Sequence, residues 1–161
     1  MYIVGAVCVQ DLPGDILAGC QVRRNMGIKM TIEARKENLE KVIDFINEEL
    51  EAADCGMKEV MQIDIAVEEL FINVCYYAYP GGTGTVDIDI SIEEDPRRAV
   101  ITFSDSGIPY DPLQKDDPDV TLSAEDREVG GLGIFMVKKS MDDMIYKYAG
   151  GRNHLTIIKN L

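Results

Sequence analysis

The feature that most constrains the fold of this chain is a long apolar helix that we predict over residues 58–79. Apolar residues recur there every three or four positions, which is the spacing of one face of an α-helix. Additional apolar residues widen that face, so we expect the helix to be largely buried. A proline and two glycines at 80–82 end it. The residues that define the face are Val60, Ile63, Val67, Leu70, Val74 and Ala78.

The remaining sequence predicts short strands and two further helices. Strands are predicted over 26–34, 85–92, 99–104, 144–148 and 155–159, and helices over 39–55 and 132–141. This order of elements is typical of a two-layer α/β sandwich. We therefore expect a mixed, mostly antiparallel sheet that is covered on one face by helices.

The first 25 residues share no periodicity with the rest of the chain. We assign residues 26–161 to one folded domain and residues 1–25 to an N-terminal extension. Two interpretations of the extension stay open. Either Met26 is the true start of the protein, or the segment is an extra arm.

The charge of the chain limits its partners. The 161 residues include 16 Lys and Arg against 29 Asp and Glu, which gives a net charge of −13. Nucleic-acid phosphates and anionic lipids repel so acidic a surface, so we expect neither nucleic acid nor a membrane as a partner. No apolar run approaches the roughly 20 residues of a membrane span.

The cysteines and the single histidine exclude further classes. Four cysteines are scattered without C-x-x-C spacing, which is typical of reduced thiols in a cytoplasmic protein. His154 is the only histidine, which removes multi-histidine metal sites and most serine-histidine-aspartate schemes. We expect a structural or solvated role for it.

Glu69 and Asn73 are polar residues within the predicted buried helix. Residues four apart lie on one helix face, about one turn from each other. A carboxylate and an amide oxygen placed in this way can hold Mg²⁺ and orient a nucleophile. The alternative is a solvated polar stripe or an ordinary hydrogen bond between the two side chains, and the pair by itself favours that alternative.

Asp105 and Gly107 follow a predicted strand in the segment Phe-Ser-Asp-Ser-Gly-Ile-Pro. An aspartate there can accept a hydrogen bond from an exocyclic amine, and a glycine lets a flat ring approach the backbone. The alternative is an ordinary Asp-Ser-Gly turn that closes the strand.

Gly130, Gly131 and Gly133 open the predicted helix at 132–141. Backbone N–H groups exposed beside a helix N-terminus can bind phosphate, although the pattern is neither G-x-G-x-x-G nor a Walker loop. The alternative is a flexible hinge. Residues 111–129 before it are acidic and without periodicity, so we predict a functional loop or lid.

In this order and spacing, the three motifs resemble the boxes of the Bergerat (GHKL) ATP-binding fold, shared by gyrase and histidine kinases. Within that fold, the sequence is most similar to the anti-sigma-factor serine/threonine protein kinases. Three stretches carry the resemblance: 69–73 (ELFIN), 104–112 with its Pro-Tyr-Asp-Pro extension, and 130–134 (GGLGI). The closing segment 151–156 resembles the last strand of the family, and the resemblance covers residues 28–161.

The resemblance implies an ATP site and assigns roles to its residues. Glu69 would be the general base, and Asn73 would bind the Mg²⁺ held by the triphosphate. Asp105 would accept from the adenine amino group. The residues that would lie near or support the base are Gly107, Pro109 and Thr156, and those that would contact phosphate are Gly130, Gly131, Leu132, Gly133, Ile134 and, from the lid, Arg127.

The resemblance also implies a function and partners. Such a protein would be a cytoplasmic homodimer that phosphorylates a small anti-anti-sigma (STAS-type) antagonist and sequesters a sigma factor. The alternative is a non-catalytic, ATP-responsive module that binds proteins. Tyr76 and Tyr77 stand where the family often has a histidine or lysine, and the predicted lid is acidic. Both departures favour the alternative, whereas the retained Glu69 favours a kinase.

Overall fold

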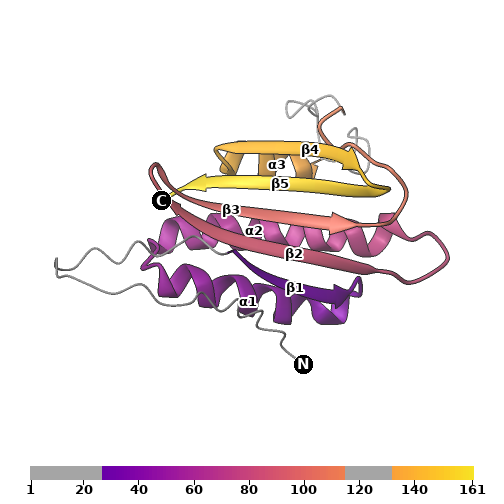
Figure 1. Ribbon diagram of the computed structural model, residues 1–161, viewed down its shortest axis with the longest axis horizontal. Helices are drawn as coiled ribbons and strands as arrows, with labels where there is room; N and C mark the ends of the chain where they lie inside the picture. Colours follow the sequence, from indigo (N-terminus) through magenta and orange to yellow (C-terminus); the bar gives the residue numbers. More distant parts are fainter. Residues whose placement is uncertain (1–26, 115–131) are drawn as a thin grey trace, which may run out of the picture.

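A five-stranded antiparallel sheet, with three α-helices on one side, forms the part of the chain that the computed structural model describes, residues 27–114 and 132–161 (Figure 1). The strands are β1 (Ile28–Glu33), β2 (Thr85–Glu94), β3 (Arg97–Asp105), β4 (Asp143–Ala149) and β5 (Arg152–Asn160). Their spatial order is β1-β2-β3-β5-β4. Every pair is antiparallel, so the predicted two-layer fold is confirmed, and no parallel pair occurs among the described residues.

The helices bury the faces that the sequence pattern predicts. They are α1 (Leu39–Ala52), α2 (Met57–Asn73) and α3 (Leu132–Ser140), with a short 3₁₀ turn η1 (Lys36–Asn38) and one π-helical turn η2 (Val74–Ala78) after α2. The predicted helix 58–79 is therefore α2 together with η2. Its buried residues are Ile63, Ala66, Val67, Leu70 and Phe71.

The core lies between α2 and the covered face of the sheet. Side chains of a strand alternate between its two faces, and the strands present their buried apolar residues to the helices. These residues include Val86, Ile88 and Ile90 of β2, Ile101 and Phe103 of β3, and Ile157 of β5. α1 covers one flank of α2, and α3 covers the other (Figure 1).

Two further expectations concern the N-terminal extension and a membrane span. Residues 1–26 lie outside it, so the N-terminal extension stays a prediction. Among the described residues, no helix combines the length and the hydrophobicity that crossing a membrane requires.

Asp87 organises a polar cluster on the face of the sheet that the helices leave open. Its carboxylate lies 3.0 Å from Lys29 Nζ and 2.8 Å from Arg152 Nη1, and Thr31 Oγ1 donates to it at 2.6 Å. Burial alone raises the pKa of Asp87, but the hydrogen bonds from Thr31, Lys29 and Arg152 outweigh it and lower the pKa to about 2. The same cluster extends across the sheet, where Ser104 Oγ and His154 Nδ1 lie 2.9 Å apart.

Replacing Asp87→Asn should destabilise the protein at neutral pH and matter less in acid. The pKa of Asp87 in the folded state is below the ordinary value of 3.8. The ionised carboxylate therefore stabilises the fold above about pH 4, and this stabilisation is lost as the pH falls toward 2. A shift of this size corresponds to roughly 2 kcal/mol of unfolding free energy. Urea denaturation of wild type and Asp87→Asn at pH 7, 4 and 3 measures this difference in unfolding free energy.

Asp89→Asn is the matched control, because Asp89 lies two residues along the same face. Burial raises the pKa of Asp89, so its charge costs stability at neutral pH and protonation in acid removes that cost. We expect no loss for this variant at pH 7. If Asp87→Asn cost the same at every pH, the ion-pair account of the cluster would be wrong.

Candidate functional site

Glu69 and Asn73 lie at the edge of the buried face of α2, the helix that packs against α3. Asn73 Nδ2 donates to Glu69 Oε1 at 2.9 Å, and both side chains are partly buried. The simple alternative, a hydrogen bond between the two side chains, is therefore present. This bond uses the amide nitrogen of Asn73, so the amide oxygen, which is the atom that would bind a cation, is not consumed by it.

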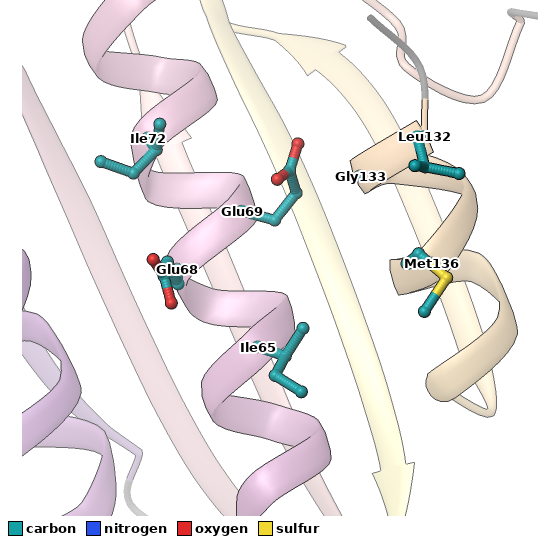
Figure 2. Close-up of a pocket in the computed structure, with 7 residues that line it drawn as sticks. All are labelled: Ile65, Glu68, Glu69, Ile72, Leu132, Gly133 and Met136. Carbon is teal, nitrogen blue, oxygen red and sulfur yellow. The ribbon is translucent and has the colours of Figure 1, made fainter. Parts of the chain in front are cut away.

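The first turn of α3 lies directly against the Glu69 carboxylate. A Cβ atom built on Gly133 would lie 2.0 Å from both Cδ and Oε1 of Glu69, far inside any permitted contact. Figure 2 shows the Glu69 side chain reaching from α2 toward this turn. The absence of a side chain at Gly133 therefore makes room for the carboxylate beside a helix N-terminus, where the helix dipole favours negative charge.

A cleft of about 400 Å³ separates α2 from α3 and includes Glu69 in its wall. The lining residues are Ile65, Glu68, Glu69, Ile72, Leu132, Gly133 and Met136 (Figure 2). Val137 and Met141 anchor α3 in the core, which fixes the far wall of the cleft. Among the described residues, no group of three or more His, Cys, Asp or Glu side chains is arranged to hold a metal by itself.

Asp105 forms a second polar centre at the end of β3, buried on the helix side of the sheet. Gly107 N donates to Asp105 Oδ1 at 2.8 Å, and Asn153 Nδ2 donates to the same oxygen at 2.9 Å. Neither of these hydrogen bonds uses Oδ2. The carboxylate is thus oriented by one oxygen while the other has the chemistry to accept from an exocyclic amine.

Gly107 is packed against the end of the helix that carries Glu69. A Cβ atom on Gly107 would lie 2.3 Å from the carbonyl oxygen of Ala78 in η2. Ile108 N donates to that same carbonyl oxygen at 2.9 Å. Tyr79 OH accepts from Ser106 N at 3.1 Å. The loop after β3 is therefore held against the end of η2, and Pro109 in this loop is exposed.

Asn153, and not Thr156, is the last-strand residue that supports Asp105. Thr156 was predicted to have this role, but it pairs with Thr102 on the open face of the sheet, with their hydroxyl oxygens 2.9 Å apart. Alternation along β5 explains the error, because Ile157 is in the core and its neighbour must face the other way. The same alternation places Asn153 inward, so the pattern contained the signal.

Hydrogen bonds at both the nitrogen and the oxygen fix the orientation of the Asn153 side-chain amide. Its nitrogen donates to Asp105 and to the Ile108 carbonyl at 3.0 Å, and its oxygen accepts from Tyr146 OH at 2.8 Å and Tyr110 N at 3.2 Å. Burial, together with the negative charge of Asp111, raises the pKa of Tyr146. The tyrosine therefore remains a donor, and the amide orientation that serves Asp105 is maintained.

The glycine-rich motif is only partly described. Arg127, Gly130 and Gly131 lie outside the described residues, so their predicted phosphate contacts stay predictions. Leu132 is exposed at the cleft, whereas Ile134 packs against the core and secures α3.

Two departures that the sequence indicated, Tyr76 and Tyr77, are found in η2, and each is 61% exposed.

Comparison with known proteins identifies the domain. The family model of the histidine kinase-like ATPase domain matches residues 32–159. The chain belongs to this family. The histidine kinase-like ATPase domain is also similar to the serine/threonine-protein kinase BtrW of Bordetella bronchiseptica, with 26% identity over 95 residues. That match covers 59% of this chain and 66% of the relative, which is just under two thirds of the relative's length.

Membership of the family implies ATP binding, and the described residues fit this ligand. Gly107 N and Asn153 Nδ2 both donate to Asp105 Oδ1, so the Oδ2 atom has the chemistry to accept from the adenine amino group. A Cβ atom would collide with Ala78 at Gly107 and with Glu69 at Gly133, so the two glycines allow close packing of the elements around the two polar centres. Both polar centres depend on α2, which carries Glu69 and is continued by η2 to the contact with Gly107.

Gly133→Ala should disturb the Glu69 carboxylate without unfolding the protein. The colliding atoms are the far end of a flexible side chain, which can swing away, and alanine has a higher helix propensity than glycine. We expect a small change in unfolding free energy and loss of the bond from Asn73. Urea denaturation and the chemical shifts of the Asn73 side-chain amide measure the two effects.

Gly107→Ala provides the contrast, because its collision is with backbone. We expect it to cost about 1–3 kcal/mol of unfolding free energy, the typical cost of overpacking. Equal destabilisation by the two alanine variants would contradict the packing described for both glycines.

Proposed function

We propose that this protein is an ATP-dependent serine/threonine protein kinase of the anti-sigma type. The observation that carries the proposal is the Glu69 carboxylate in the wall of the cleft, against Gly133 and hydrogen bonded by Asn73. A module that only binds ATP has no need of a carboxylate at this point, whereas transfer to a hydroxyl group needs a base. The similarity to a protein named a serine/threonine-protein kinase supports the same reaction.

Each residue has a defined task in this proposal. Asp105 Oδ2 accepts from the adenine amino group, Gly107 and Pro109 lie beside the base, and the residues around Gly133 face the phosphates. Asn73 Oδ1 would hold the Mg²⁺ that accompanies the nucleotide. When bound, ATP supplies the phosphoryl group. Glu69 takes the proton from the serine or threonine hydroxyl, whose oxygen gains the phosphoryl group as ADP leaves.

The partners are proposed together with the reaction. The acceptor is a small antagonist protein of the anti-anti-sigma (STAS) type, and the kinase also sequesters a sigma factor and acts as a homodimer in the cytoplasm. The net charge of −13 supports protein partners over nucleic acid or anionic membranes.

Glu69→Gln tests the proposal. Glutamine keeps an oxygen for the bond from Asn73 but cannot take a proton, so ATP binding should persist while phosphoryl transfer falls at least about 100-fold. Transfer from radiolabelled ATP to purified STAS-type proteins from the same genome is the measurement, and calorimetry follows ATP binding. Glu48→Gln on the exposed face of α1 is the control, and an unchanged rate for Glu69→Gln would refute the assigned base.

A second function, an ATP-responsive binding module without catalysis, is favoured by Tyr76 and Tyr77. Both are exposed in η2, and residues 74–79 contain no cation that could contact phosphate. If wild type transfers no phosphate while ATP still changes its affinity for a partner, this second function is correct.

A further inference from the structure

Large apolar side chains are exposed along the side of the molecule that contains Glu69. In α2, Met57, Met61 and Ile65 recur every four residues, so they follow one helix face for about 12 Å. Leu132 and Met136 of α3 lie across the cleft (Figure 2). These five make up almost half of the eleven large apolar and aromatic side chains that are exposed in the described part of the chain. We call them the α2–α3 apolar surface.

Among residues 27–114 and 132–161, no packing contact accounts for this surface. α2 already buries the opposite face of the helix in the core, and α3 is anchored by Val137 and Met141. A contiguous exposed patch of this kind is typical of a binding site. Its position is informative, because Ile65, Leu132 and Met136 share the walls of one cleft with Glu69.

We infer that the α2–α3 apolar surface is where the phosphoacceptor segment of the substrate protein docks. The inference rests on the proposed kinase function. A base must come within about 2.6–3.2 Å of the hydroxyl that it deprotonates, so the chain that carries this hydroxyl must enter the cleft at Glu69. That chain then has to cover the apolar residues on either side of the opening.

The separation of Ile65 and Glu69 along α2 indicates which side chains such a segment carries. Ile65 lies one helical turn from Glu69, which is about 6 Å along the axis. In an extended segment, side chains two residues apart lie on the same face, separated by about 6.6 Å. An apolar side chain two residues from the acceptor serine or threonine therefore reaches Ile65 and Met136. Glu68, which also lines the cleft and is exposed, favours a basic residue in the same segment and disfavours an acidic one.

Ile65→Asp tests the docking surface. A buried carboxylate would oppose the apolar contact, so we expect KM for a STAS-type acceptor protein to rise at least tenfold, with little change in kcat or in ATP affinity. Ile65→Leu, which keeps an apolar side chain, should leave KM close to that of wild type. Met136→Asp should raise KM as Ile65→Asp does. The control is Ile145→Asp, because Ile145 on the open face of β4 is 49% exposed, close to the 55% of Ile65.

The possible outcomes separate the two proposals. If wild type phosphorylates an acceptor and Ile65→Asp behaves like Ile145→Asp, the docking surface is wrong and the kinase function stands. If no acceptor is phosphorylated, the kinase function fails and the docking surface fails with it. If sedimentation shows that Ile65→Asp breaks a dimer while KM is unchanged, the surface joins two copies of this chain and the inference is overturned.

Discussion

Packing of α2 against the covered face of the sheet is the contact on which the rest of the structure depends. Val67 and Phe71 are fully buried in it, and their burial fixes the rotation of the helix. That rotation aims Glu69 at α3 (Figure 2), and Asn73 donates to its carboxylate. The same helix is continued by η2, whose carbonyl at Ala78 meets Gly107. One buried helix therefore positions both the candidate base and the loop beside Asp105, so a change in its core face would disturb both.

The two faces of the sheet contribute to the site in different ways. On the covered face, Asp105 and Asn153 are paired across β3 and β5. On the open face, Arg152 donates to the carbonyl oxygen of Ser104 at 2.7 Å and also pairs with Asp87. Because Ser104 and Arg152 directly precede Asp105 and Asn153, the polar cluster joins the strand ends that carry the site. Stability and site geometry are therefore linked through neighbouring residues on opposite faces.

Local patterns were sufficient to predict the fold and the elements that carry the candidate site residues. Helical spacing predicted α2, and the motif residues Glu69, Asn73 and Asp105 lie on the elements expected for them. What local patterns could not give was contact between distant segments. A Cβ atom at Gly107 or Gly133 would collide only because of how η2 and α3 pack. The role of Asn153 depends on the register of β5 against β3. Thr156 lies on the face of β5 opposite to Asn153, which strand alternation requires and motif similarity does not reveal.

Calorimetric titration with Mg·ATP of wild type and of Asp105→Asn tests the central claim, that this domain binds ATP through Asp105. Asparagine can keep an oxygen for the bonds from Gly107 and Asn153, but it would then present an N–H group, instead of an acceptor, to the adenine amino group. We expect wild type to bind and the variant to bind at least tenfold more weakly with its fold intact. Equal affinity in the two proteins, or no binding by wild type at millimolar ATP, would contradict the claim.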